Sequence, residues 1–130
     1  MGRTPERITK TGNPDVILDV ILRDRVLYLA LVNRRDHPAT KVRVSFKRKL
    51  MGLGGDVDIA ALPLWQKLDY LAPGRMIEVP VDRAEVFFAR DRGTPLAVTI
   101  AYTDPEGARF QAAITHDLEA YRDFPGIVVR

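Results

Sequence analysis

The segment VNRRDHPATKVRVSF, residues 32–46, holds the densest group of side chains that could do chemistry. It contains three arginines, one aspartate and one of the two histidines of this 130-residue chain. A histidine beside a carboxylate can transfer protons, and guanidinium groups bind carboxylates and phosphates. The segment is therefore a candidate for an active-site loop or for a turn that leads into a strand.

The spacing within this segment favours the turn. Asp36 and Pro38 both promote turns, the first by capping the backbone with its side chain and the second by its fixed φ. The residues that follow, KVRVSFK, alternate strictly between polar and apolar. This alternation predicts a strand over 41–47 with both valines and Phe46 facing inward. His37 is then expected at the tip of a loop.

Few residues of the chain suit catalysis or metal binding. Ser45 is the only serine, and its outward position in mid-strand lacks the glycines of a nucleophile elbow. His37 and His116 fall in different elements, which favours separate structural roles over a shared metal site. The absence of cysteine excludes disulfides, thiolate catalysis and iron–sulfur clusters. We therefore expect no catalytic activity, no metal and no cofactor.

Two further patterns resemble ligand-binding loops without completing them. Asp56 and Asp58 beside glycines could bind calcium, but the other ligands of an EF-hand are missing, so a solvated loop is favoured. The sequence GLGG at 52–55 is followed neither by a helix start nor by the Lys-Ser/Thr pair of a phosphate loop.

A row of basic residues is the strongest candidate for a functional surface. Residues 1–50 carry 12 Lys/Arg and 5 Asp/Glu, whereas residues 51–130 carry 8 and 12, so the net charge of +3 is unevenly distributed. A basic row could contact phosphates or an acidic protein surface, and it could equally keep a sheet edge soluble. It has no interleaved aromatic residues to stack on bases. The candidate anionic-partner face comprises Arg34, Arg35, Lys41, Arg43, Lys47 and Lys49.

Alternating or β-branched segments predict about seven strands. They lie at 15–22, 23–33, 41–47, 65–71, 76–81, 95–103 and 108–118. The run at 23–33 is apolar on both faces and suits a central strand, whereas Pro80 indicates an edge strand. Asp104-Pro105-Glu106-Gly107 suits a type I turn, which makes the last two strands a hairpin.

The only clear helix is predicted over 82–93. Asp82 is expected to cap its N-terminus, Glu85 to complete the capping box, and Gly93 to end it. The preceding segment 49–70 is too broken for a long helix and predicts a glycine loop and a helical turn.

Four aromatic residues of these two segments could form a ligand patch, but packing over the open end of the core is favoured. They are Trp65, Tyr70, Phe87 and Phe88.

Three stretches carry a likeness to a known family: LYLALVN with DHPATKVRVSF, YLAPGRMIEVPV, and VTIAYTDPEGARFQAAI. Between Pro14 and Leu118 they resemble a bacterial immunoglobulin-like domain of the CARDB or fibronectin III kind. The resemblance implies an all-β fold, an immunoglobulin-like antiparallel β-sandwich of about seven strands with one short helix. It also implies a role in adhesion, scaffolding or assembly without catalysis.

The expected organisation is a flexible tail over 1–13, a sandwich domain over 14–118, and a C-terminal tail over 119–130 that could add an edge strand through GIVV. No apolar run approaches the ~18–20 residues that span a bilayer. The N-terminal residues also lack the apolar region of a secretory signal, so a cytoplasmic protein without membrane insertion is expected. Few amide side chains, with arginine in excess of lysine, suit a heat-tolerant host and equally a GC-rich genome.

The function expected from these features is a non-catalytic protein-interaction or assembly module whose partner is another protein or its own copies. Two alternatives remain open. One is a self-assembling structural subunit of a larger particle, and the other is a sequence-independent nucleic-acid binder that works through the basic strand.

Overall fold

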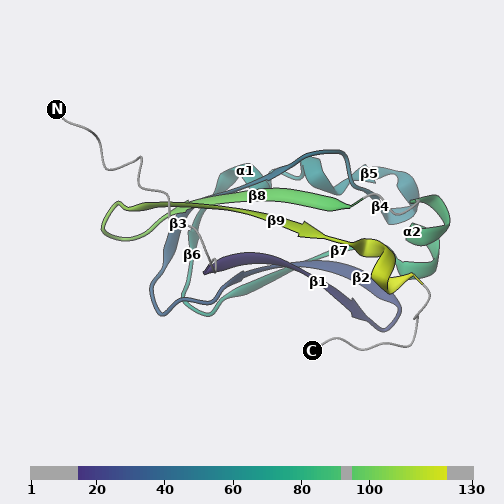
Figure 1. The fold of residues 1–130 in the computed structure, drawn as a ribbon, viewed down its shortest axis with the longest axis horizontal. Helices are drawn as coiled ribbons and strands as arrows, with labels where there is room; N and C mark the ends of the chain where they lie inside the picture. The colour runs from purple at the N-terminus through teal and green to yellow at the C-terminus, as the bar shows by residue number, and fades with distance from the viewer. Residues whose placement is uncertain (1–14, 92–94, 123–130) are drawn as a thin grey trace.

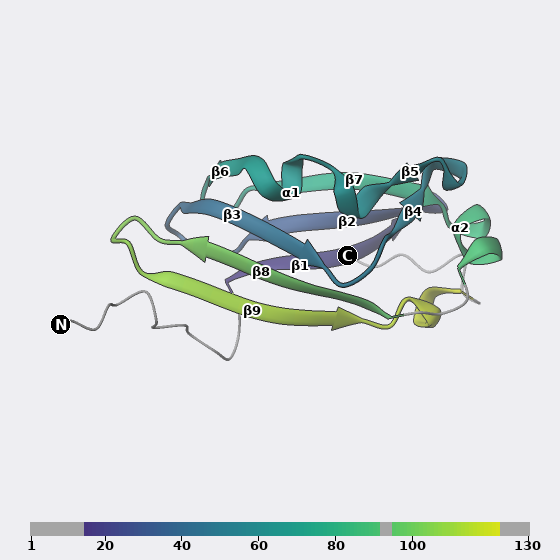
Figure 2. The same ribbon diagram turned by 90° about the horizontal axis from the view of Figure 1, so that it is seen from above.

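The computed structural model describes residues 15–91 and 95–122. Within them the chain forms an all-β sandwich in which a three-stranded and a four-stranded antiparallel sheet face each other (Figures 1 and 2). Seven strands build the two sheets, which confirms the fold class expected from the sequence. The N-terminal tail, Gly93 and the GIVV segment lie outside the described residues.

The three-stranded sheet has the order β1-β2-β7, formed by Val16–Arg23, Val26–Asn33 and Met76–Arg83. β2 is the central strand and β7 an edge strand, as the apolar run and Pro80 predicted. Every second residue of β1 is buried, because a strand that covers a core on one side exposes the alternate residues on the other. A bulge between β2 and β7 shifts the register after Leu27.

The four-stranded sheet has the order β6-β3-β8-β9. Its strands are Leu68–Leu71, Ala39–Phe46, Leu96–Thr103 and Arg109–His116. β8 and β9 form the predicted hairpin: the amide of Gly107 donates to the carbonyl of Asp104 at 3.0 Å, and Gly107 has a φ of +89° that suits glycine. Val44 of β3 is 1% exposed while its neighbour Ser45 is exposed, so the predicted faces of this strand are confirmed.

Short elements connect β3 to β6 along one side of the sandwich (Figure 2). They are β4 (Met51–Gly52), η2 (Leu53–Gly55), β5 (Val57–Asp58), η3 (Ile59–Ala61) and α1 (Leu64–Lys67). The predicted strand over 65–71 begins only at Leu68, because Trp65 lies in α1. Its indole donates to the carbonyl of Ile59 at 2.6 Å, and its ring packs edge-on against Phe46. Trp65, Phe87 and Phe88 are buried as expected, whereas Tyr70 is 59% exposed.

α2 (Ala84–Arg90) closes the end of the sandwich opposite the β8–β9 hairpin (Figure 1). The prediction that Asp82 caps this helix is wrong: Arg83 occupies the N-cap position without a side-chain bond, and Asp82 belongs to β7. The carboxylate of Asp82 instead accepts from the amide of Gly54 in η2 and pairs with Arg90. These tertiary partners, together with burial, outweigh the local capping pattern.

The last described element, η4 (Leu118–Tyr121), is followed by Arg122, which donates to the backbone of α2. Leu118 is buried in the core, and the guanidinium of Arg122 donates to the carbonyls of Phe88 and Asp91 at 2.5 and 2.6 Å. The first residues of the expected C-terminal tail are therefore held by the sandwich.

Candidate functional site

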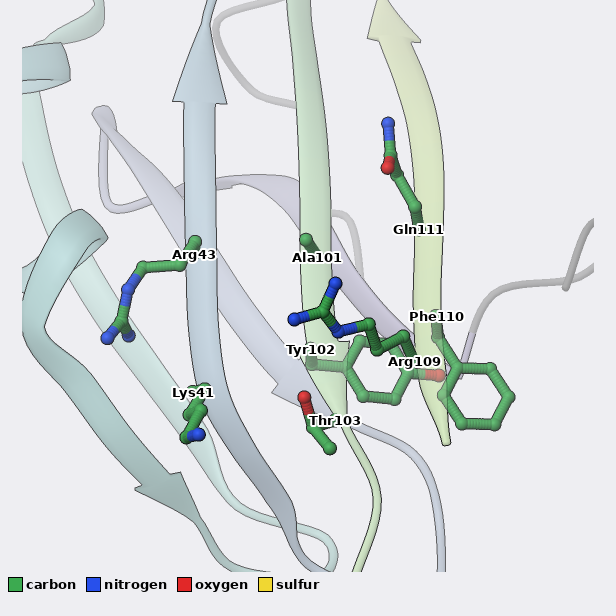
Figure 3. Close-up of a pocket in the computed structure, with 8 residues that line it drawn as sticks. All are labelled: Lys41, Arg43, Ala101, Tyr102, Thr103, Arg109, Phe110 and Gln111. Atoms are coloured by element: carbon green, nitrogen blue, oxygen red, sulfur yellow. The ribbon is translucent and has the colours of Figure 1, made fainter. Parts of the chain in front are cut away.

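The outer face of the four-stranded sheet carries a shallow basin of about 350 Å³ (Figure 3). Ala101 of β8 forms part of its floor and lies in register between Arg43 of β3 and Gln111 of β9. In the next row Thr103 lies between Thr40 and Arg109. The basin exists because small side chains on β8 leave space that the longer side chains of its neighbours surround.

The second cation of this face, Lys41, lies at a β-bulge in β3. Thr40 pairs with Thr103, and Arg43 pairs with Ala101. Between these two pairs β3 therefore has one residue more than β8. In a regular strand one residue separates two core-facing neighbours. Here two residues, Thr40 and Lys41, separate the buried residues Ala39 and Val42. Lys41 has a φ of +51°, a left-handed conformation that costs a non-glycine residue ~1 kcal/mol or more.

Arg43 forms the wall of the basin beside β6. Its guanidinium donates to the carbonyls of Val42 and Leu68 at 2.9 and 3.1 Å and to the carboxylate of Asp69 at 3.2 Å. Figure 3 shows this side chain turned away from β8. The charge of Arg43 is therefore largely compensated by Asp69, although this carboxylate is 80% exposed.

Arg109 approaches from the opposite side. Its side chain extends from β9 across β8 towards β3 (Figure 3). Within the part of the chain that the structure describes, neither Arg109 nor Lys41 has a carboxylate partner, and both are exposed. With Arg43 and Asp69 forming a neutral pair, the basin has a local charge of about +2.

The structure separates the six residues of the predicted anionic-partner face. Lys41 and Arg43 line the basin, whereas Lys47 and Lys49 are exposed beyond the end of β3. Arg34 is exposed in the β2–β3 loop.

Arg35 lies inside one end of the sandwich. Its side chain is 12% exposed, and its guanidinium carbon lies 5.6 Å from the ring centre of Tyr102 and 5.1 Å from that of Phe110. The carboxylate of Asp104 is 4.0 Å away. Burial raises the pKa of the Tyr102 hydroxyl, an effect that Asp15 strengthens and Arg35 opposes. Arg35 is therefore a packing residue at this end of the core.

The other sequence candidates have structural partners. Asp58 accepts hydrogen bonds from the amides of Leu50 and Ala60 at 2.9 and 3.1 Å. His37 is exposed in a loop beside Asp36, as expected, and Nε2 of His116 donates to the carbonyl of Leu18 at 2.6 Å. Over residues 15–91 and 95–122 no group of three or more His, Asp or Glu is arranged to hold a metal.

Among the described residues, the most buried carboxylate belongs to Asp82, which is 7% exposed. Burial acts to raise the pKa of Asp82, but hydrogen bonds from Arg90 and from the amides of Gly54 and Arg83 outweigh it and lower the pKa below its usual value. Arg90 also donates to the carbonyl of Met51 at 2.9 Å. The cluster joins β4, η2, β7 and α2, so its role is structural.

Comparison with known proteins places the sequence in a family. Residues 3–122 match the family described as Domain of unknown function (DUF8453). The chain belongs to the DUF8453 family. No curated protein and no solved structure matches it.

The two large sheets of this DUF8453 domain have four edge strands, and three of these carry a feature that opposes further strand pairing. β7 has Pro80 and a bulge, β6 is only four residues long and carries Asp69, and the Leu18 carbonyl of β1 is occupied by His116. Among the residues that the structure describes, β9 carries no such feature along 109–115. Its residues 110–115 are uncharged, and none of its eight residues is buried.

The sequence patterns of the DUF8453 domain did not single out Arg109, Gln111 or the outer edge of β9, which pairs with no strand among the described residues. Alternation places Arg109 and Gln111 on the outward face of a strand, which was a usable signal. Their proximity to Lys41 and Arg43 depends on β8 pairing with both β3 and β9, which local patterns do not specify. Among the described residues, no helix has both the length and the apolar character to cross a membrane.

Proposed function

We propose that the DUF8453 domain is a non-catalytic protein-interaction module that binds its partner by strand addition to β9. The observation that carries this proposal is the contrast between β9 and the three protected edges. An unpaired edge presents a row of backbone donors and acceptors that an extended chain can complete, and alternate side chains then give specificity. The eight residues of β9 offer ~25 Å of such an edge at the usual strand rise.

We further propose that the sandwich is immunoglobulin-like, and the strand order supports this. In immunoglobulin-type sandwiches the first, second and fifth strands share one sheet, and the third, sixth and seventh share the other. The seven strands of the two large sheets follow that division, because β1, β2 and β7 are the first, second and fifth of them along the chain. The fourth, β6, pairs with the third.

A second copy of the domain is the partner whose fit can be derived. Antiparallel pairing of β9 with itself about Ala112 brings Phe110 opposite Ile114 twice on the inward face. On the outward face it brings Arg109 opposite Thr115. Apolar cross-strand pairs stabilise a sheet, and this register places no like charges opposite each other. The inward residues of β9 are only half-buried in one copy, so pairing would cover them.

Light scattering over a range of protein concentrations tests this pairing. The wild type is compared with two variants that each carry one lysine on the outer face of the sheet. Ala113 of β9 and Thr99 of β8 are register partners, so both substitutions place a charge on the same face. Ala113→Lys should abolish dimerisation because a charged edge opposes strand addition, whereas Thr99→Lys should leave it intact.

Hydrogen exchange extends the test to other partners. The free-edge amides of β9 should exchange rapidly in the monomer and become protected in the complex. A monomeric wild-type domain whose β9 amides stay unprotected with every partner found would refute strand addition. If the domain is monomeric and another protein protects the β9 amides, strand addition is retained, and that protein is the partner in place of a second copy.

A further inference from the structure

We propose that the basin lined by Lys41, Arg43, Ala101 and Arg109 binds a phosphate monoester, supplied free or on a phosphorylated side chain. This inference goes beyond the proposed function and does not depend on it, because an added strand would extend the sheet sideways and leave its outer face open. It rests on the charge, shape and backbone geometry of the basin.

The charge of the basin matches a dianion. Lys41 and Arg109 approach from opposite sides of β8 and have no carboxylate partner among the described residues. Two uncompensated cations on one small surface repel each other, and an anion between them converts this repulsion into attraction. A phosphate monoester carries a charge of about −1.5 to −2 near pH 7, whereas a single carboxylate or phosphodiester carries −1.

The shape of the basin also favours a tetrahedral oxyanion over a carboxylate. Donors lie on two sides of the floor: the ammonium group of Lys41 on β3, and the guanidinium of Arg109, which reaches from β9 over β8 (Figure 3). Thr103 adds a hydroxyl between the two sides. A phosphate group has three terminal oxygens that can accept from several directions, and arginine matches it with two parallel donors.

The backbone of Lys41 is an independent indication. The residue that supplies one of the two free cations is also one of the four non-glycine residues with positive φ among those described. Glycine would occupy this conformation without strain. Strained residues at bulges commonly re-aim a side chain towards a functional surface. Here the strained residue is Lys41, which lines the basin together with Arg43 and Arg109.

The binding test uses amide chemical shifts of the ¹⁵N-labelled domain. Three short peptides are compared, identical except for phosphoserine, glutamate or serine at one central position, and inorganic phosphate is titrated separately. The phosphoserine peptide should shift the amides of Lys41, Ala101 and Thr103 with saturation and at least fivefold higher affinity than the glutamate peptide. Equal affinities for the two peptides, or shifts centred on Lys47 and Lys49, would overturn the proposal.

The two phosphate probes identify the source of the ligand. Inorganic phosphate that binds as tightly as the phosphoserine peptide would assign the basin to free phosphate compounds. A phosphoserine peptide that binds more tightly would assign it to a phosphorylated protein, since its flanking residues must then contribute. Both outcomes support the monoester. A single-stranded oligonucleotide that shifts the same amides and binds more tightly than both phosphate probes would overturn the proposal, and the ligand of the basin would then be a nucleic acid.

Substitutions with matched charge separate this site from general attraction to a basic protein. Lys41→Gln and Arg109→Gln should each weaken the phosphoserine peptide at least fivefold. Lys47→Gln removes the same charge from the same stretch of chain outside the basin and should change the affinity less than twofold. Equal weakening by all three variants would show non-specific attraction and refute the site.

Lys41→Gly excludes unfolding as the cause of lost binding. Glycine accepts the positive φ of this position, so the variant should keep or raise the melting temperature while losing phosphate affinity. A Lys41→Gly variant that binds as tightly as the wild type would overturn the assignment of Lys41.

Discussion

The side-chain amide of Asn33 donates a hydrogen bond to the carbonyl of Leu71 at 3.0 Å and so connects β2 of one sheet to β6 of the other. The same nitrogen lies 2.9 Å from the carbonyl of His37 and 3.3 Å from that of Ala72, while its side-chain oxygen accepts from the amide of Arg35 at 3.0 Å. Asn33 is completely buried. One polar side chain therefore holds the β2–β3 loop against the β6–β7 turn.

Asn33→Ala should destabilise the domain by ~2–4 kcal/mol, because the buried carbonyl of Leu71, two part-buried carbonyls and one backbone amide lose their hydrogen-bond partner. Urea denaturation measures this difference. Arg34→Ala provides the control, since Arg34 is the exposed neighbour and its removal should change the free energy of unfolding by less than ~0.5 kcal/mol. Similar losses in the two variants would contradict the role of the Asn33 amide.

Val44→Asp should unfold the domain or lower its stability by several kcal/mol, whereas Ser45→Asp should be tolerated to within ~0.5 kcal/mol. The two residues are neighbours, but Val44 faces the core and Ser45 faces solvent. Thermal melts followed by circular dichroism provide the comparison. Equal melting temperatures would mean that β3 has the opposite face buried.

Asp82→Asn should lower the free energy of unfolding by ~2–3 kcal/mol at pH 7, because it removes the charge that pairs with Arg90. The pKa of Asp82 is lower in the folded state than in the unfolded chain, so its contribution is complete above the unfolded value of ~4 and disappears as the pH falls through the folded value. The difference between wild type and variant should therefore shrink between pH 6 and pH 2. Asp69→Asn, at an 80% exposed carboxylate, is the control with a small effect at both pH values. A difference for Asp82→Asn that stays constant with pH would contradict the ionic role of this residue.

Gly52→Ala should cost at least ~1–3 kcal/mol through overpacking. A Cβ atom at Gly52 would lie 2.2 Å from the carbonyl oxygen of Val81, and this neighbour is strand backbone that cannot turn aside. Gly74→Ala is the control for replacing a glycine without a steric clash. A Cβ atom at Gly74 would meet no atom within 4 Å, and only the φ of +71° at this position opposes alanine. Denaturant melts should rank Gly52→Ala as the more destabilising variant, and the reverse order would contradict the close approach.

The alternation of residues along single strands was sufficient to predict much of this fold. It identified β3 with its buried and exposed faces, the central position of β2 and the β8–β9 hairpin, because side chains on a strand alternate with a period that depends only on the local backbone. Pro80 indicated an edge strand for an equally local reason, since proline lacks a backbone donor.

Local rules failed where distant residues competed for the same group. The pattern at Asp82 predicted a helix cap, but Arg90 and the Gly54 amide reach this carboxylate only after β7, η2 and α2 have packed together. Arg35 was expected on a solvent-exposed basic face, and it lies over Tyr102 and Phe110 because the hairpin folds back onto the β2–β3 loop. In both cases burial changed the partner available to a charged side chain.

The sequence by itself determined which side chains of each strand face outward, and hence that Lys41, Arg43 and Arg109 are surface cations. Only the tertiary structure decided that they surround one basin. Lys41 and Arg109 are 68 positions apart in the chain, and they share a face because β8 pairs with β3 on one side and β9 on the other. Strand order and the bulge at Lys41 follow from the burial of both sheets against a common core, a non-local free energy that no short stretch of sequence contains.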